Sequence, residues 1–532
     1  MNSMKRLTVL SFALASVFAA AGASAATTLK YCSEGSPAGF DPGQFTAGTD
    51  FDASAETIYN RLVEFERGAT KVIPGLAEKW SVSDDGLSYT FNLRKGVKFH
   101  SNESFKPTRE FNADDVVFTF SRIVDKNHPY RKAYPTEFPY ATDMGMDENI
   151  TKVEKLDAYT VKFTLKNVDA AFIQNLAMSF ASVHSAEYAD SLLKAGKPTL
   201  INTAPIGTGP FVFKSYQKDA VIRYTANKDY WRKGEVKVDN LIFAITTDST
   251  VRAQKLKSGE CDIAFQTKPA DTVVLKADPK INVMSQAGFN LGYLGYNVKH
   301  KPLDNVVVRR ALDMAINKKA IIDAVYQGAG QPATNPMPPT QWSYNKNLKD
   351  APYNPEMAKA MLAKAGVKDL SVTLWAMPVV RPYNPNGKQM AEMIQADWAK
   401  IGVKGVITTY EWGEYLKRAK AGEPDTILVG WTGDNGDPDN WLGTNLSCDA
   451  VGGNNYAQWC DKTFNDLVMA AKRTSDVKKR TEMYMKAQEI FKKELPWSTI
   501  AHSTVTVPMS KKVSNFKISP FGLMAFYGVS VK

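Results

Sequence analysis

The sequence has few of the side chains that enzymes use most often as nucleophiles, bases or metal ligands. It contains 4 cysteines and 5 histidines in 532 residues, and the histidines, at positions 100, 128, 184, 300 and 502, are scattered. It lacks the phosphate loop GxxxxGK[ST], a GxGxxG after a strand, the zinc-hydrolase motif HExxH and the acyl-transfer motif GxSxG. We therefore expect no enzyme, no cofactor and no metal site. A carboxylate-dependent peptidase stays an alternative, because paired carboxylates can come from anywhere in a fold.

A basic stripe or tail of the kind that binds nucleic acid is also missing. Lys and Arg number 66 against 55 Asp and Glu, a net charge of +11 spread over the whole chain. Binding to phosphates requires basic residues to be concentrated locally. The densest cluster, Lys478, Lys479 and Arg480, is interpreted as the solvated face of an amphipathic helix. We expect no nucleic-acid partner.

Long apolar runs are absent except at the N-terminus. Residues 1–6 carry Lys5 and Arg6, residues 7–21 are apolar, and residues 23–25 are small (Ala-Ser-Ala). This order is typical of a cleaved signal peptide, and the run is too short for a membrane span. No cysteine follows closely enough for a lipid anchor. The sequence predicts a signal peptide at 1–25, export to the periplasm, and no membrane span in the mature chain.

The four cysteines suit an oxidising compartment, where they can pair in three ways. Cys448 and Cys460 are separated by eleven residues that include Gly452 and Gly453, which suits a disulfide closing a local loop. Cys32 and Cys261 would then join two distant segments. A zinc site is the alternative, and it is disfavoured because neither CxxC-like spacing nor nearby histidines are present.

Two patterns follow one another along the chain. Up to about residue 286 it is rich in strands, including 89–93 and 159–165, with a helix opened at Asn112 and a helix-like stretch at 52–65. From about 287, strands at 371–375, 403–409 and 426–431 alternate with helices at 388–401 and 412–420. Such alternation predicts an α/β unit whose ligands bind beyond the carboxyl ends of strands. That rule points to the residues after Trp375 and after Val429.

An acidic segment, 434–440, follows the last of these strands. Its glycine is third and its proline fifth, whereas a calcium loop needs alternate oxygen ligands with Gly at the sixth position. We therefore interpret Asp437 and Asp439 as caps of backbone donors in a turn. Asp434, nearest the strand end, is a candidate for ligand binding.

Several motifs together resemble one protein family. Residues 74–122 are similar to the signature of the family 5 extracellular solute-binding proteins, the peptide and nickel receptors of ABC importers. Supporting segments are 207–211 (GTGPF), 227–231 (NKDYW) and 308–312 (VRRAL). Three further segments resemble the dipeptide receptors of that family, namely 31–35, 375–386 and 430–437. The similarity covers essentially the whole mature chain.

The resemblance implies a fold and its divisions. It implies the α/β, two-lobed periplasmic binding fold (class II, cluster C), with mixed sheets, a hinge and an extra subdomain in the first lobe. The expected parts are a first lobe at 26–286 with the subdomain at about 60–205, a second lobe at 287–504, and a C-terminal segment, 505–532, returning to the first lobe. It also implies the pairs Cys32–Cys261 and Cys448–Cys460, an inner-membrane ABC permease as partner, and a monomer.

The resemblance further implies a dipeptide site between the lobes. In dipeptide receptors an aspartate pairs with the ligand's α-ammonium and an arginine with its α-carboxylate, and the matching residues are Asp434 and Arg381. The loop Thr46-Ala47-Gly48 faces them, and the flanking contacts are Pro382, Tyr383, Trp431, Thr432 and Gly433. The chemistry fits, because a buried zwitterion needs both charges paired and arginine offers a bidentate fork to a carboxylate. A longer peptide, haem or a saccharide remains an alternative ligand.

Overall fold

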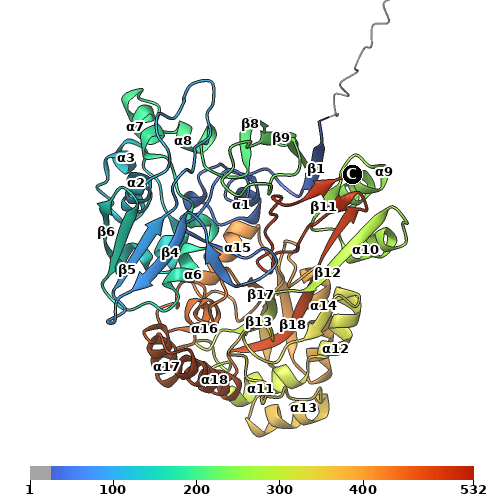
Figure 1. Cartoon of the computed structure of the whole chain (residues 1–532). Coiled ribbons are helices and arrows are strands. Elements are labelled where there is room, and N and C mark those ends of the chain that lie inside the picture. Colours follow the sequence, from blue (N-terminus) through green and yellow to red (C-terminus); the bar gives the residue numbers. More distant parts are fainter. Residues whose placement is uncertain (1–25) are drawn as a thin grey trace, which may run out of the picture.

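The computed structural model describes residues 26–532, so the predicted signal peptide at 1–25 lies outside the described residues. Its largest sheet has 12 strands, with the order β16-β15-β17-β13-β18-β11-β1-β10-β9-β8 and with β12 and β14 added along β18. The strand β18 (Trp497–Ser510) takes part in both halves of this sheet, and Figure 1 shows it in red, reaching both lobes. The result is a two-lobed mixed α/β fold. In residues 26–532 no helix has the length and apolar composition needed to cross a membrane.

The first lobe is built on the half of the sheet that contains the N-terminal strand. Here β1 runs parallel to both β10 and β11, while β8, β9 and β12 are antiparallel to their neighbours. The elements are β1 (Thr28–Ser33), β8 (Phe211–Gln217), β9 (Val221–Ala226), β10 (Asn240–Ile245), α9 (Ser249–Ser258), β11 (Ile263–Ala264), α10 (Pro269–Lys276) and β12 (Ile281–Ala287). Buried residues of the C-terminal segment, among them Phe516 and Phe526, pack in the same core as Leu29 and Tyr31.

A separate four-stranded sheet, ordered β4-β5-β7-β6, lies within the first lobe's sequence. Its strands are β4 (Ala77–Val82), β5 (Ser88–Leu93), β6 (Ile150–Asp157) and β7 (Thr160–Leu165). The helix α2 (Ala113–Val124) begins with a capping box, in which Asn112 accepts from the Asp114 N–H and Asp115 accepts from the Asn112 N–H, each at 2.9 Å. The remaining elements before β8 are α1 (Gly48–Ala53), β2 (Val63–Phe65), β3 (Val72–Pro74), α3 (Pro129–Ala133), α4 (Pro139–Asp143), α5 (Met146–Asn149), α6 (Phe172–Leu176), α7 (Ala186–Lys194) and α8 (Leu200–Thr203), with 3-10 turns η1 (Pro42–Gln44) and η2 (Ser179–Ala181).

The second lobe has helices on both faces of its half-sheet, and two buried apolar clusters fill the space between them. The strands β15 and β16 are parallel to each other, and β15 is parallel to β17, as the alternating pattern predicts. The elements are β13 (Asn290–Tyr296), α11 (Val306–Met314), α12 (Lys318–Ile321), the π-turn η3 (Ile322–Tyr326), β14 (Gly330–Pro332), α13 (Pro355–Lys364), β15 (Ser371–Trp375), α14 (Gly387–Lys400), β16 (Lys404–Thr408), α15 (Trp412–Lys420), β17 (Thr426–Thr432), α16 (Asp439–Leu446), α17 (Lys462–Lys472) and α18 (Val477–Glu494). A short pair, β19 (Val513–Ser514) and β20 (Ser530–Val531), ends the chain.

One predicted helix is wrong. Instead of spanning 52–65, the helix α1 ends at Ala53, and β2 begins at Val63. Between them the backbone bonds to a distant segment, since the Thr57 carbonyl accepts from Phe211 at 2.9 Å and the Ile58 carbonyl from Gly209 at 2.7 Å. These carbonyls are therefore not available to the i+4 donors that a continuing helix needs.

The prediction of a solvated basic face on α18 is wrong for one of its three residues. Arg480 is buried, and its Nη2 lies 2.7 Å from Asp437 Oδ1. Asp437 also accepts from the Asp439 N–H at 3.0 Å, so the predicted capping role of Asp437 is confirmed. The acidic turn lies against α18, and a buried carboxylate needs a cation that the turn itself lacks.

The chain crosses between the lobes at two adjacent places, from β12 to β13 and within β18. β12 ends at Ala287 and β13 begins at Asn290, while residues 497–501 of β18 pair with β13 and residues 504–510 with β12. At the crossing, the Gly288 N–H donates to Ser503 O at 2.8 Å, and the buried Asn290 amide exchanges two hydrogen bonds of 2.9 Å with Ser503. A Cβ at Gly288 would lie 2.4 Å from Ser503 O, so only glycine lets the strands approach this closely.

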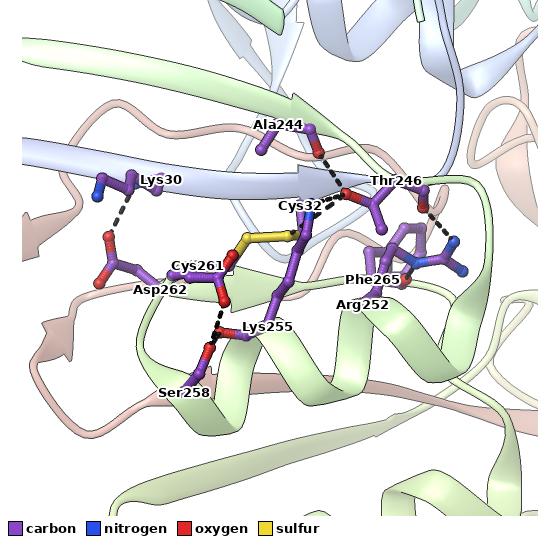
Figure 2. The surroundings of a disulfide bond; sticks show 11 residues. Lys30, Cys32, Ala244, Thr246, Arg252, Lys255, Ser258, Cys261, Asp262 and Phe265 are labelled. Carbon is purple, nitrogen blue, oxygen red and sulfur yellow. Dashed lines mark hydrogen bonds between the residues drawn. A yellow bond between two sulfur atoms is a disulfide. The ribbon is translucent and has the colours of Figure 1, made fainter. Parts of the chain in front are cut away.

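The two disulfides that the resemblance implies are present. Cys32 bonds to Cys261 and Cys448 to Cys460, with Cα–Cα distances of 5.8 and 4.7 Å. The first joins the end of β1 to a residue two positions before β11, and Figure 2 shows it beside α9, next to Thr246. Residues 26–532 hold no free cysteine.

We expect the unreduced protein to show no reactive thiol, even after denaturation. Changing Cys448 and Cys460 together to serine should lower the free energy of unfolding by about 3 kcal/mol, since the disulfide closes a short loop and limits the unfolded chain. Thiol titration and urea denaturation measure the two effects. Four titratable thiols in the unreduced protein would contradict the pairing.

Candidate functional site

A cavity of about 580 Å³ lies between the two lobes. Its walls come from the start of the first lobe, from the loops after β15 and β17 of the second lobe, and from the C-terminal segment. Nine of the ten residues predicted to contact a ligand line it: Thr46, Ala47, Gly48, Arg381, Pro382, Tyr383, Trp431, Thr432 and Asp434. Gly433 does not line the cavity. A Cβ there would lie 2.3 Å from the Phe289 ring, so its role is close packing.

Asp434 lies two residues beyond the carboxyl end of β17 and is half-buried. Its Oδ1 accepts from the Tyr140 hydroxyl at 2.7 Å and its Oδ2 from the Asn440 amide at 3.1 Å. Asn440 in turn accepts from the Asp434 N–H and from the Trp431 indole, which fixes the loop. Burial raises the pKa of Asp434 to about 6 despite the hydrogen bonds from Tyr140 and Asn440, and Asp143 adds to the rise.

Arg381 lies on the loop between β15 and α14 and is exposed at the cavity. Residues 381 and 384 exchange two backbone hydrogen bonds of 3.1 and 2.9 Å, so the loop is a tight turn. The guanidinium lies 5.6 Å from the centre of the Trp412 ring, and no Asp or Glu oxygen of residues 26–532 lies within the 4.0 Å of an ion pair. It is therefore a cation open to an anionic ligand.

Tyr383 anchors this turn to the sheet. The Tyr326 hydroxyl donates to its carbonyl at 2.6 Å. A Cβ at Gly292 would lie 2.2 Å from Tyr383 O, and one at Gly430 would lie 2.3 Å from the Tyr383 ring. The glycines of β13 and β17 thus let the turn lie directly on the sheet and direct Arg381 toward the cavity.

The first lobe brings the loop 46–48 opposite these residues. The loop is exposed and leads into α1, whose Asp50 N–H donates to Ala47 O at 3.1 Å. The turn before it is held by Asp41, whose carboxylate accepts from both Nη atoms of Arg122, at 2.7 and 3.1 Å, and contacts His184 at 3.1 Å. All three side chains are buried.

Sequence reasoning missed several residues of the cavity wall. Tyr140, in α4 of the subdomain, is 294 positions from Asp434 in the sequence. Glu34, Phe265 and Gln266 lie where β1 and β11 end. The rule that ligands bind beyond the carboxyl ends of parallel strands, applied to the first strand as well as to the later ones, would have indicated Glu34.

Among residues 26–532 there is no group of three or more His, Cys, Asp or Glu side chains placed to hold a metal ion. No histidine lines the cavity either. Among its charged groups, the carboxylate of Asp434 and the guanidinium of Arg381 line the same space, with aromatic walls from Tyr383 and Trp431. This arrangement suits a small ligand that carries charges of both signs.

Comparison with known proteins gives a consistent result. Residues 71–453 match the model of the bacterial extracellular solute-binding proteins, family 5 Middle. The chain is 67% identical over 518 residues (97% of this chain, 96% of the relative) to di/tripeptide-binding protein 1 of Pseudomonas aeruginosa (strain UCBPP-PA14). It is 49% identical over 512 residues (96% and 93%) to heme-binding protein A of Haemophilus influenzae. The structure of a dipeptide binding protein from Pseudoalteromonas sp. SM9913 in complex with Met-Leu aligns with a TM-score of 0.86 at 38% identity, covering 95% of this chain and 100% of that one.

Proposed function

We propose that this chain, which belongs to the family 5 bacterial extracellular solute-binding proteins, binds dipeptides between its lobes and delivers them to an ABC importer. The observation that carries the proposal is that Asp434 and Arg381, on separate loops of the second lobe, line one cavity. We assign the ligand's ammonium to Asp434 and its carboxylate to Arg381. The loop 46–48 and the side chains of Pro382, Tyr383, Trp431 and Thr432 supply the remaining contacts.

Two opposite charges at a fixed separation act as a ruler for peptide length. Each added residue lengthens an extended peptide by about 3.3–3.6 Å, so a longer peptide moves one terminus away from its partner. A buried terminus without a partner costs several kcal/mol. We therefore propose a preference for dipeptides over longer peptides.

The cellular setting is part of the same proposal. We propose a periplasmic location after removal of residues 1–25, an inner-membrane permease as partner, and a monomer with lobes at 26–286 and 287–504 and a returning segment at 505–532. We also propose that the protein is a receptor without enzymatic activity. Belonging to a family of bacterial extracellular solute-binding proteins supports the location, the transport partner and the receptor role.

A thermal-shift screen of di-, tri- and tetrapeptides, with haem and a chitin-type saccharide as comparison ligands, tests the ligand class. A ligand that binds only the native state at 100 times its Kd stabilises it by about 2.7 kcal/mol, so dipeptides should raise Tm clearly. A larger shift with haem or a saccharide, and none with any dipeptide, would overturn the proposal.

Prolonged incubation distinguishes a receptor from a peptidase. A dipeptide added to the purified protein should be recovered intact by chromatography. Free amino acids released at a rate that Asp434→Asn abolishes would show an enzyme instead.

Dipeptide affinity should depend on pH through Asp434. Its pKa of about 6 in the ligand-free protein means that acid protonates the carboxylate that the ammonium needs. We expect Kd to be lowest near pH 7, where Asp434 is ionised and the ligand's own ammonium is still protonated, and to rise by up to about tenfold per pH unit below 6, since one proton competes with the ligand. Calorimetric titration measures this change. Asp434→Asn should bind weakly and show a flat profile over the same range, whereas an unchanged slope would assign the dependence to another group.

A further inference from the structure

Residues that follow the strands of the first lobe's half-sheet form part of the cavity wall. In its sheet β1 lies between β10 and β11, and both neighbours are parallel to it, so three carboxyl ends meet at one edge. The chain passes from β10 through α9 to β11, on the opposite side of β1. This is a topological switch point, where α/β sheets bind ligands. Glu34, directly after β1, and Gln266, just after β11, line the cavity here.

Glu34 lies beside the part of the cavity assigned to the peptide. A Cβ at Gly35 would lie 3.4 Å from Thr49 Cγ2, so the segment after β1 contacts the start of α1. The loop 46–48 immediately precedes Thr49 and faces the same cavity. A ligand that contacts this loop therefore lies near Glu34.

The carboxylate of Glu34 is half-buried and has no cationic partner. Its Oε2 accepts from the Tyr31 hydroxyl at 3.2 Å. In the part of the chain that the structure describes, no Lys, Arg or His nitrogen lies within 4.0 Å of it. Glu56, a second cavity glutamate, is different, because Arg61 Nη1 lies 2.9 Å from its Oε1. Apart from Asp434, which is assigned to the ligand's ammonium, the other lining acids, Glu66 and Asp143, are exposed.

Arg252 interacts electrostatically with Glu34, but its guanidinium makes its hydrogen bonds to other groups. Its guanidinium donates to four backbone carbonyls, those of Thr246, Thr247, Phe265 and Gln266. Figure 2 shows the guanidinium directed at Thr246 and Phe265. It thereby holds together the ends of β10 and β11. Its charge reaches Glu34 only at longer range, not through an ion pair.

A second carboxylate lies behind Glu34. Asp52 is buried and accepts from the Met524 N–H at 2.8 Å. Burial, and then the negative charge of Glu34, raise the pKa of Asp52 well above its ordinary value. A cation placed at Glu34 pairs with it and also reduces the effect of the Glu34 charge on the pKa of Asp52.

We propose that Glu34 selects among dipeptides by pairing with a cationic ligand side chain, so that peptides containing lysine or arginine are preferred. The inference rests on the proposed function, since it takes Asp434 and Arg381 as the partners of the two termini. Glu34 then remains as the half-buried carboxylate of the cavity wall that is free to pair with a side chain.

The test compares ligands that differ only in side-chain charge. Ala-Lys and Lys-Ala are titrated against the same peptides with Nε-acetyl-lysine, which keeps the stem and removes the charge, with Ala-Ala as reference. The wild-type protein should bind at least one lysine peptide about fivefold to tenfold more tightly than its acetylated form, as expected of a partly exposed ion pair. Glu34→Gln, which can still accept from Tyr31, should abolish the difference and leave Ala-Ala affinity unchanged.

Glu66→Gln is the matched control, because it removes an equal charge from an exposed position of the same cavity. It should keep the preference. No preference in the wild-type protein, or a preference that survives Glu34→Gln, overturns the inference while leaving the proposed function intact. Failure of every dipeptide in this set to bind the wild-type protein refutes the proposed function, and the inference with it. The wild-type comparison needs no variant, so it decides even where Glu34→Gln does not fold.

Discussion

Replacing Asp434 with asparagine is expected to weaken dipeptide binding by about 30-fold to several thousand-fold. Asparagine has the same size and can still accept from the Tyr140 hydroxyl, which lies 2.7 Å from the carboxylate. What is lost is the negative charge, and an enclosed ammonium without a partner costs on the order of 2–5 kcal/mol. Isothermal titration with Ala-Ala measures the change.

A ligand modification should reproduce this loss. An N-acetylated dipeptide should bind the wild-type protein weakly but lose little more on Asp434→Asn, because one interaction cannot be removed twice. A C-amidated dipeptide should behave in the same way with Arg381→Gln, with a smaller loss since Arg381 is exposed. Asp143→Asn is the matched control, as it removes an exposed carboxylate from the same cavity. Additive losses would show that these residues do not hold the termini.

Replacing Asp41 with asparagine should lower the free energy of unfolding by about 3–5 kcal/mol. The carboxylate binds both Nη atoms of Arg122, contacts His184 at 3.1 Å, and accepts from Gln44 at 2.7 Å, all inside the first lobe. Arg122 Nε has no partner there, so an uncharged neighbour leaves a buried guanidinium without compensation.

Urea denaturation at neutral pH measures this effect. The exposed pair Lys319–Asp323 on the second lobe is the control, because Asp323→Asn should cost at most about 0.5 kcal/mol. Equal stability of Asp41→Asn and the wild-type protein would show that the buried network contributes nothing. A comparable loss in both variants would point to a general effect of charge.

Elements whose signals are local could be predicted from the sequence. The helix α13 begins at Pro355 after the Asn354 cap and ends before Gly366, whose φ is +72°, as the cap and proline positions indicate. The helix α15 and the strand β15 also have the predicted bounds. Each of these segments makes its hydrogen bonds either within itself or with a neighbouring strand of regular pattern.

Elements whose partners are distant could not be predicted. The stretch after Ala53 has helical periodicity, yet the carbonyls of residues 57 and 58 bond to residues 211 and 209. The charge pattern of α18 is amphipathic, yet Arg480 is buried by the turn that carries Asp437. In both cases a tertiary contact outweighs the local preference.

The candidate site shows the same division. Asp434 and Arg381 were found through long motifs, and the strand-end rule independently indicates the loops on which they lie. Tyr140 had no such signal, because a single tyrosine on a five-residue helix of another subdomain is unremarkable in sequence. Only the approach of the two lobes brings its hydroxyl to Asp434.

The place of β18 in the sheet has a consequence for how the chain folds. Its first half lies between β13 and β14, and its second half between β11 and β12, so it closes an edge in each lobe. Until residues 497–510 have been synthesised, both half-sheets keep open edges that can pair with other chains. A nascent or truncated chain that ends before β18 is thus prone to aggregate, and neither lobe can complete its sheet ahead of the other. Because this one strand completes both half-sheets, the two lobes reach their final form in a single late step of folding.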